Sequence, residues 1–393
     1  MYSDSFIQFV KQNIDRNPSE IALKSGERYD FSMSDAASFI YGMQKIKEKV
    51  PEWYLNFNLI IPARVSLEQS SSYHTALFKQ QFFEDKIVCD ITGGFGVDSF
   101  YISKVSKKVH YYETNKQLAS VVSHNFQILG VKNIEINSSE INNQSTLPLC
   151  DVIYCDPSRR DENNRRMYAI ADCSPNISEL KNHLFGFAPK IVVKLSPMSD
   201  ITKSVNELGS VSAVYIISVN NECKELLFVL DKNNVTNSEY DIFSINIQEN
   251  KTESFCHTLQ QERESSIKFD IPKEGTFLYE PNSSILKSGA FKSVANAFGI
   301  CKLEKSSHLY TSSNLADNFP GRVFLIEKIY PFKKQKLSDI FEKYPKANIS
   351  VRNFPLKSEE LRKKLKIEEG GEIYIFGTTD CFGEKLIICC KKY

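Results

Sequence analysis

The sequence predicts an α/β fold with a seven-stranded, doubly wound, Rossmann-like sheet, an N-terminal helical region and a C-terminal α+β module. Three observations lead to this prediction. Between residues 86 and 230, short runs rich in β-branched residues alternate with helical segments, which is typical of βαβ units and a mostly parallel sheet. A glycine-rich turn follows the first of these runs. The chain of 393 residues is also long enough for two to four domains.

Residues 1–65 are expected to form a separate helical region. Phe6 and Phe9 recur at helical spacing, and Ser34-Asp35 is suited to cap a helix that runs to residue 49. Pro51 should end that helix, because proline interrupts helical hydrogen bonding. This region carries no motif that indicates a chemical function.

The sheet domain is expected to span residues 66–231, beginning with a helical stretch at 71–79. His74 and Lys79 of this stretch could line a ligand pocket, but a surface position is the simpler expectation for either side chain. The short turn Asn220-Asn221-Glu222 favours an antiparallel hairpin between the last two strands. The seven strands are expected at 86–90, 109–113, 134–137, 151–155, 190–195, 214–219 and 226–230.

Polar or charged residues follow each of the first five strands. Ligands of parallel sheets bind at the carboxyl ends of the strands, so these residues are expected to share one rim. The first strand leads into a D-x-x-x-G-x-G turn, which permits a bend and a close backbone approach to a ligand. This turn contains Asp90, Thr92, Gly93, Gly94 and Gly96, and the candidates after the other strands are Glu113, Thr114, Ser139, Asp156, Pro157 and Lys194.

The spacing favours a mononucleoside-like ligand over a dinucleotide. Glu113 lies 17 residues after Gly96, where an acidic residue can accept hydrogen bonds from ribose hydroxyls. A G-x-G-x-x-G fingerprint that starts at Gly94 would need glycine at position 99, but the chain has Ser99 there. We therefore expect no cradle for a pyrophosphate.

Together, Asp90, the glycines at 94 and 96, Glu113 and Asp156-Pro157 resemble motifs I, II and IV of class I S-adenosylmethionine-dependent methyltransferases. The resemblance implies that the cofactor is S-adenosylmethionine, with S-adenosylhomocysteine as its product. It also implies that the glycine turn holds the methionine part and that Glu113 holds the ribose. On the same grounds Thr92, Gly93, Thr114 and Ser139 are expected to belong to the cofactor site.

The residues after the fourth strand depart from one pattern of that family. Methyltransferases that act on exocyclic amines of bases typically have Asp/Asn-Pro-Pro-aromatic here, whereas this chain has Asp156-Pro157-Ser158-Arg159. We expect Asp156 to orient or deprotonate the acceptor. Pro157, Arg159 and Lys194 are further catalytic candidates, and a supporting place in the sheet rim is the alternative for Lys194. Arg159 and Arg160 either hold the substrate or form an ion-paired loop.

The C-terminal part also resembles a known family. Tyr279-Glu280-Pro281-Asn282, Phe319-Pro320-Gly321-Arg322 and Arg352-Asn353-Phe354-Pro355 are similar to runs in bacterial methyltransferase-related proteins that end in a ferredoxin-like segment and a THUMP-like domain. The resemblance implies a ferredoxin-like segment at 277–320 and a THUMP-like domain at 321–393. The stretch before them, 232–276, is rich in polar residues and is expected to be a connection with some strand character of its own. Since THUMP domains of RNA-modifying enzymes bind RNA, it also implies structured RNA, such as tRNA or rRNA, as the substrate.

Local patterns predict the elements of this module. A capped helix is expected at 279–291, followed by a turn into a strand near 322. Further strands are expected at 348–353, 372–377 and 385–390, with a helix at 358–365. The predicted RNA contact is the basic run Arg362, Lys363 and Lys364 in that helix.

The charge distribution is consistent with a polyanionic partner. Residues 320–393 hold 16 Lys and Arg against 10 Asp and Glu, although the net charge of the whole chain is only +1. On charge alone, a solvated basic face explains this excess equally well.

Composition narrows the class of protein. No apolar run approaches the roughly 20 residues of a membrane span, and the first residues do not follow a signal-peptide pattern, so we expect a cytoplasmic protein. The ten cysteines include no C-x-x-C pair, which favours reduced thiols and no metal site. Two alternatives stay open: a methyltransferase of proteins or small molecules, and a non-catalytic RNA-binding protein that retains the cofactor fold.

Overall fold

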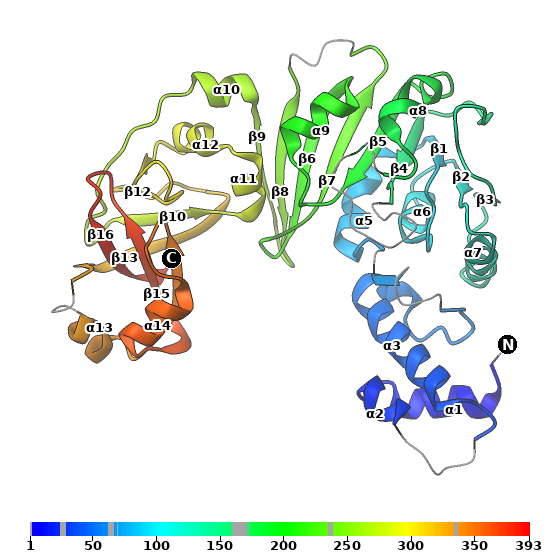
Figure 1. The fold of residues 1–393 in the computed structure, drawn as a ribbon, viewed down its shortest axis with the longest axis horizontal. Coiled ribbons are helices and arrows are strands. Elements are labelled where there is room, and N and C mark those ends of the chain that lie inside the picture. Colours follow the sequence, from blue (N-terminus) through cyan, green and yellow to red (C-terminus); the bar gives the residue numbers. More distant parts are fainter. Residues whose placement is uncertain are drawn as a thin grey trace. The chain divides into compact units, whose positions relative to one another are not determined.

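Figure 1 shows a computed structural model of the chain, which describes residues 2–23, 29–61, 67–68, 70–158, 170, 173–234, 239–333 and 337–393. The chain divides into two compact units. The first comprises Met1–Ser212 and Lys224–Ser238, and the second comprises Ala213–Cys223 and Glu239–Tyr393. No helix of these described residues is both long enough and apolar enough to span a bilayer.

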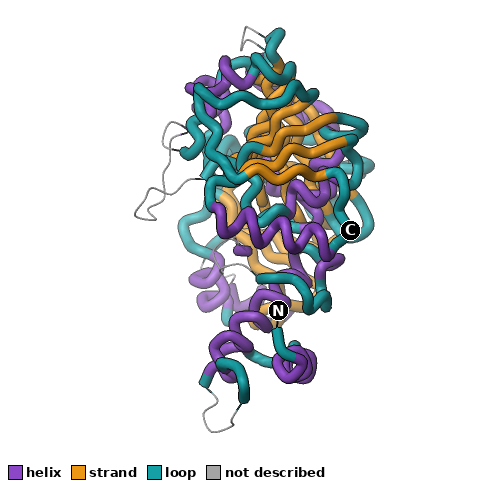
Figure 2. The backbone as a smooth tube through the Cα atoms, turned by 90° about the vertical axis from the view of Figure 1, so that its right-hand side faces the viewer, coloured by secondary structure: helices purple, strands orange, loops and turns teal. Residues whose placement is uncertain are grey.

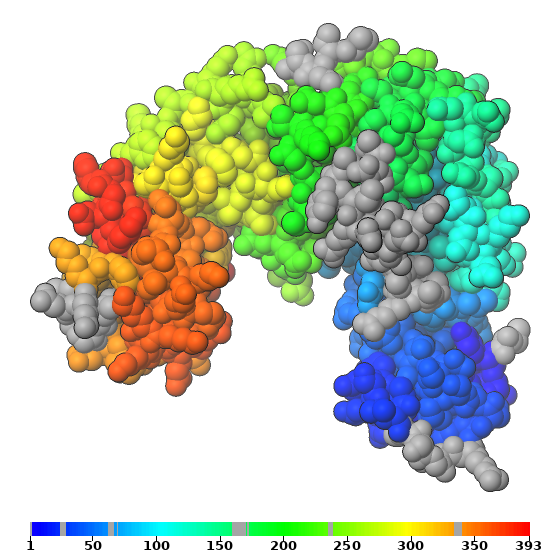
Figure 3. Space-filling model, in the orientation of Figure 1, coloured from blue at the N-terminus to red at the C-terminus, as the bar shows by residue number. Residues whose placement is uncertain are grey.

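The first unit begins with the predicted N-terminal helices, drawn blue in Figures 1 and 3 and purple in Figure 2. They pack around a core that contains Phe6, Phe9 and Trp53. The cap of the long helix is Ser32 rather than the predicted Ser34-Asp35, because the hydroxyl oxygen of Ser32 accepts the free backbone N–H groups of both residues. The elements are α1 (Asp4–Asn13), α2 (Pro18–Ala22), α3 (Met33–Lys49) and the 3₁₀ turn η1 (Pro51–Trp53).

The sheet of the first unit has the strand order β3-β2-β1-β4-β5-β7. The first five strands are parallel and β7 runs antiparallel to β5. All four residues of β4 are buried, as expected for a strand with both faces covered. The elements are α5 (Tyr73–Lys79), η2 (Gln80–Phe82), β1 (Ile87–Asp90), α6 (Val97–Ser103), β2 (Lys108–Tyr112), α7 (Lys116–Ile128), β3 (Ile134–Asn137), β4 (Val152–Cys155), α8 (Ile177–Leu184), β5 (Lys190–Leu195), α9 (Ile201–Leu208) and β7 (Glu222–Asp231).

The sheet has nine strands in all, where the sequence predicted seven. In the second unit, β6 (Val211–Val219) pairs in parallel with β8 (Asp241–Ile247), and β8 pairs antiparallel with β9 (Thr252–Thr258). These strands and α10 (Leu259–Glu264) occupy the stretch predicted to be a connection. The sequence indicated only some strand character here, because polar residues fill part of the interior of these strands: the buried Asn246 amide donates to the Glu253 carboxylate at 3.1 Å.

A second sheet forms the rest of this unit, with the order β11-β12-β10-β13-β16-β15-β14. All its pairs are antiparallel except β14 with β15. The elements, yellow to red in Figure 1, are β10 (Phe277–Pro281), α11 (Ser283–Ser288), α12 (Phe291–Phe298), β11 (Cys301–Lys302), β12 (Tyr310–Ser312), β13 (Gly321–Pro331), α13 (Leu337–Lys343), β14 (Lys346–Arg352), α14 (Ser358–Leu365), β15 (Glu368–Thr379) and β16 (Lys385–Lys392).

Strand β10 occupies part of a segment predicted to be helical. The helix α11 begins only at Ser283, because the side chain of Asn282 caps it by accepting the N–H of Ile285 at 3.1 Å. Glu280 is the penultimate residue of β10, and its buried carboxylate binds two guanidinium groups. Arg322 donates through Nε at 2.8 Å and Arg352 donates through Nη2 at 2.8 Å. Side-chain charge and backbone pairing thus join β10 to the strands that follow it.

Candidate functional site

The glycine turn after β1 is shaped by positions where a side chain does not fit. Gly94 and Gly96 have φ angles of +56° and +79°, a conformation that residues with a Cβ rarely adopt. A Cβ at Gly93 would overlap the ring of Tyr111, and one at Gly96 would lie 2.7 Å from the ring of Phe126. The turn therefore needs glycine for its backbone conformation and for the packing of these two rings, and the close approach of a ligand stays a prediction.

Asp90 lies at the end of β1 and is almost fully buried, with 1% of its surface exposed. Its Oδ2 accepts the hydroxyl of Ser99 at 2.5 Å, and its Oδ1 accepts the backbone N–H of Thr92 at 3.1 Å. Burial raises the pKa of Asp90 to about 7, although these two hydrogen bonds act in the opposite direction. Asp90 thus fixes the shape of the turn, and its contact with a cofactor stays a prediction.

Glu113 connects the end of β2 to the same turn. Its Oε2 accepts the backbone N–H of Gly94 at 2.9 Å, and its Oε1 accepts the N–H of Asn115 at 2.8 Å and the hydroxyl of Thr114 at 3.2 Å. The side chain is half-buried, so the carboxylate keeps acceptor capacity for a ligand. Ser139 lies exposed in the loop after β3, and its cofactor role stays a prediction.

Thr92 connects the glycine turn to the end of β4. Its Oγ1 accepts the backbone N–H of Asp156 at 2.6 Å. Pro157 is buried and Ser158 is exposed. The predicted substrate residues Arg159 and Arg160 lie outside the described residues.

Five charged side chains meet beside Asp156, and we call them the lysine–carboxylate cluster: Lys79, Asp98, Asp156, Lys194 and Glu225. The Lys194 Nζ lies 2.5 Å from Asp156 Oδ2 and 3.5 Å from Asp98 Oδ2. The Lys79 Nζ lies 3.0 Å from Asp98 Oδ1 and 2.9 Å from Glu225 Oε1. The two lysines therefore alternate with the three carboxylates, and each positive charge faces two negative ones.

Two neutral side chains add hydrogen bonds to the cluster. The Ser71 Oγ accepts from Lys79 at 2.9 Å and from Lys194 at 3.0 Å, and it donates to Asp98 at 2.8 Å. The buried Tyr154 hydroxyl also donates to Asp98, at 2.7 Å. Both hydroxyls donate to Oδ2 of Asp98, which fixes this carboxylate between the two ammonium groups.

Burial and charge oppose each other in this cluster. Burial alone would raise the pKa of Asp98, but the ammonium groups of Lys79 and Lys194 outweigh it and hold that pKa below its ordinary value. Burial alone would lower the pKa of Lys194, but Asp156, Asp98 and Glu225 outweigh it and raise that pKa. Both groups are therefore charged at neutral pH.

The structure corrects one expectation and adds residues that the sequence did not reveal. Lys79, for which a surface position was expected, is completely buried, whereas His74 is half-buried. Lys194 does contact Asp156. The sequence did not predict four further residues of the site: Ser71, Asp98, Tyr154 and Glu225. One signal for a buried charge was available, since Glu225 lies in the same run as the apolar residues of β7.

In the second unit, the basic residues of α14 differ in exposure. The Arg362 side chain is 19% exposed and its Nη1 forms ion pairs with Glu359 at 2.9 Å and Glu369 at 3.2 Å. Lys363 and Lys364 are exposed, with the Lys364 Nζ lying 4.7 Å from the centre of the Phe332 ring. An RNA phosphate would therefore meet Lys363 and Lys364 more easily than Arg362.

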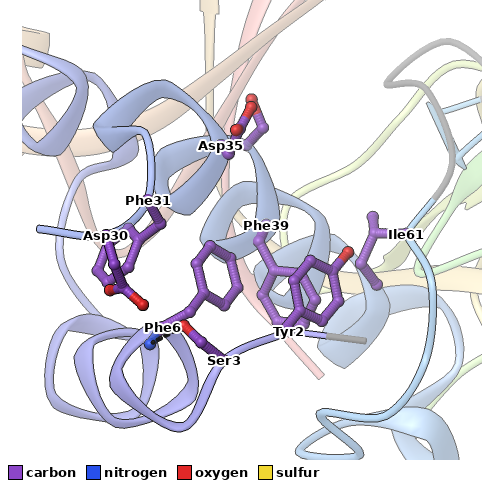
Figure 4. Close-up of a pocket in the computed structure, with 9 residues that line it drawn as sticks. Tyr2, Ser3, Phe6, Asp30, Phe31, Asp35, Phe39 and Ile61 are labelled. Carbon is purple, nitrogen blue, oxygen red and sulfur yellow. Dashed lines mark hydrogen bonds between the residues drawn. The ribbon is translucent and has the colours of Figure 1, made fainter.

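A separate pocket of about 450 Å³ lies among the N-terminal helices (Figure 4). Its lining combines aromatic rings with two carboxylates, and it shares no residue with the site around Asp156. The residues that line this pocket include Tyr2, Phe6, Asp30, Phe31, Asp35 and Phe39.

Among the residues that the structure describes, no group of three His, Cys, Asp or Glu side chains is arranged to bind a metal ion.

Two family models match the C-terminal part of the chain. Residues 277–320 match a ferredoxin-like domain, and residues 321–392 match a domain described as THUMP domain-like. No curated protein matches the sequence.

A similar crystal structure covers the full chain. It is that of a candidate methyltransferase from Porphyromonas gingivalis W83, which is 33% identical over 100% of this chain and 99% of that one, with a TM-score of 0.87. An rRNA methylase from Streptococcus thermophilus matches 41% of this chain and 95% of its own at 16% identity, with a TM-score of 0.30. A SAM-dependent methyltransferase from Aquifex aeolicus is 18% identical over 40% of this chain and 88% of its own, with a TM-score of 0.30. The similarity to the Porphyromonas protein therefore carries the assignment.

Proposed function

The chain belongs to the family of class I methyltransferase-fold proteins that end in a ferredoxin-like and a THUMP-like domain, and from this premise we propose that it methylates structured RNA with S-adenosylmethionine. S-adenosylmethionine supplies an electrophilic methyl group on a sulfonium. The observation that carries the proposal is the connection of the glycine turn to Asp156 through Thr92, at 2.6 Å. It fixes a cofactor-type turn next to an acidic residue that can face an acceptor.

The residues around the turn fit a cofactor of this kind. Gly94 leaves the backbone open, because an added Cβ would meet nothing nearer than the Thr92 carbonyl oxygen at 3.8 Å, whereas Gly93 and Gly96 make room for the rings of Tyr111 and Phe126. Glu113 lies where it can accept hydrogen bonds from ribose hydroxyls. Methyl transfer depends mainly on alignment of donor and acceptor, which a rigid turn favours. We propose Asp156 as the residue that orients or deprotonates the acceptor, with Pro157 fixing its backbone. Arg159 and Arg160 stay candidates for holding the substrate.

Isothermal titration calorimetry tests the cofactor assignment. Full-length protein should bind S-adenosylmethionine and S-adenosylhomocysteine in the micromolar range, and Gly94→Val should abolish the binding. Glu113→Ala should also abolish it, whereas Glu113→Gln, which keeps one acceptor oxygen, should weaken it. Glu135→Ala is the matched control, since this exposed glutamate of β3 pairs with Lys108 and His110 and, among the residues that the structure describes, lies away from the glycine turn. The absence of heat with both ligands would exclude the proposal.

The RNA assignment is supported by the THUMP-like match at 321–392 and by the exposed Lys363 and Lys364. Purified protein and S-adenosylmethionine labelled in the methyl group should transfer label to RNA from a strain that lacks this protein. Label in protein or small molecules instead would favour the alternative substrates. Cofactor and RNA binding without any transfer would indicate a non-catalytic RNA-binding protein.

A further inference from the structure

We propose that the acceptor atom is a hydroxyl oxygen, the ribose 2′-oxygen of RNA, and that Lys194 and Asp156 act on it while Lys79, Asp98 and Glu225 position them. This inference rests on the proposed function and names the acceptor of the same site. It follows from the burial of the lysine–carboxylate cluster, from its charge and from the residues that follow Asp156.

Burial decides which members of the cluster can reach a substrate. The side chain of Asp156 is 35% exposed and that of Lys194 is 10% exposed, and their charged atoms lie 2.5 Å apart. The side chains of Lys79 and Glu225 are only 1% and 6% exposed. Asp156 and Lys194 therefore form the open end of the cluster, and Lys79 with Glu225 forms its closed end.

The charge at the open end suits an oxygen acceptor. A hydroxyl oxygen gains negative charge as its proton leaves, and a fixed ammonium in a partly buried site stabilises that charge. An amine nitrogen instead gains positive charge as the methyl group arrives, and the ammonium of Lys194 offers that charge no stabilisation. Enzymes that methylate a base amine also typically have an aromatic ring after this motif, whereas Ser158 and Arg159 follow Asp156-Pro157 in this chain.

The reaction balances with the groups present. The hydroxyl oxygen forms a bond to the methyl carbon, while the sulfur–methyl bond breaks and its electron pair returns to sulfur, giving a thioether. The hydroxyl proton passes to the Asp156 carboxylate and then to water on its exposed side. Lys194 remains an ammonium because the surrounding carboxylates raise its pKa, so it stabilises the oxygen rather than accepting the proton.

The closed end of the cluster keeps Lys194 directed at Asp156. Asp98 is a competing partner, since its Oδ2 lies 3.5 Å from the Lys194 Nζ. Lys79 and Tyr154 occupy the Asp98 carboxylate, at 3.0 Å and 2.7 Å, and this reduces its attraction for Lys194. Glu225 in turn holds Lys79 at 2.9 Å. Lys79, Asp98 and Glu225 are thus positioning residues.

Alkaline hydrolysis of the labelled RNA tests the acceptor atom. A 2′-O-methyl group removes the hydroxyl that alkali needs to cleave the next phosphodiester bond, so label should appear in alkali-stable dinucleotides. Label in mononucleotides would show base methylation, which overturns this inference and leaves the proposed function intact. No label in RNA would overturn both.

Variants test the roles of the residues. Lys194→Met should lower kcat on the order of 10²-fold with little change in S-adenosylhomocysteine binding. Lys194→Arg, which keeps the positive charge, should retain a larger part of the wild-type kcat. Lys190→Met, at the exposed start of the same strand, is the control and should leave kcat unchanged. The double variant Lys79→Met/Glu225→Leu removes the closed pair without leaving a lone charge, and it should lower kcat about tenfold while KM for RNA stays constant. The roles are overturned if Lys194→Met keeps more than half of the activity or if the double variant changes only KM.

Discussion

Replacing Lys79 by methionine should destabilise the first unit strongly. Lys79 is completely buried and forms ion pairs with Asp98 and Glu225 at 3.0 and 2.9 Å. Removing one partner of a buried pair leaves an uncompensated charge and costs about 3–5 kcal/mol. For a domain of this size, 1 kcal/mol corresponds to roughly 2–4 °C in Tm, so we expect Tm to fall by about 6–20 °C.

Differential scanning calorimetry of the full-length protein measures this effect. Lys203→Met is the matched control, because the side chain of Lys203 is 60% exposed and lies 3.6 Å from Glu207, a geometry worth about 0–1 kcal/mol. Combining Lys79→Met with Glu225→Gln should recover part of the loss, since the buried glutamate charge is then gone as well. Equal Tm values for Lys79→Met and Lys203→Met would refute the reasoning.

Three further predictions concern the glycine turn, the pH dependence and the basic helix. Gly96→Ala should abolish cofactor binding and cost about 1–3 kcal/mol by chemical denaturation, because a side chain at φ +79° is strained and meets Phe126; unchanged binding would contradict the steric argument. The pKa of Asp90 is raised on folding to about 7, so the folded state binds the proton more tightly than the unfolded chain, and stability should fall as pH rises from about 4 to about 7. The free energy of unfolding, measured by chemical denaturation at several pH values, should depend less on pH in Asp90→Asn. An unchanged pH dependence would exclude Asp90 as the cause. Reversing the charge of Lys363 and Lys364 should weaken RNA binding and reduce its dependence on salt, as measured by fluorescence anisotropy, because fewer counterions are then released; equal salt slopes would exclude this helix as a contact.

The parallel strands and their rim could be predicted because their signals are local. Buried strands such as β4 carry unbroken apolar runs, and the residues that follow parallel strands must lie at the same edge. The register confirms this for Asp90, which pairs with Tyr111 of β2 and Tyr154 of β4.

The closed end of the lysine–carboxylate cluster could not be predicted from one sequence. Lys79 and Glu225 are 146 residues apart, and nothing local to either indicates a buried partner. A lysine is nearly always exposed unless it is paired, which is why a surface position was expected for Lys79. That expectation was wrong because the partner, Glu225, is distant in the sequence. Strands β8 and β9 gave only a weak signal for a related reason, since the buried Asn246 donates to Glu253 inside the sheet and such residues make its pattern look polar.

The continuous sheet of the second unit has a consequence for how this protein can evolve. The two family matches meet at residues 320 and 321, yet β10 and β13 pair along five residues across that boundary, from Phe277 with Leu325 to Pro281 with Gly321. Glu280 on one side also holds Arg322 and Arg352 on the other. Recombination at this junction would expose two strand edges and leave a buried carboxylate unpaired. The two segments are therefore not interchangeable cassettes, and a lineage should gain, lose or exchange them as one heritable piece.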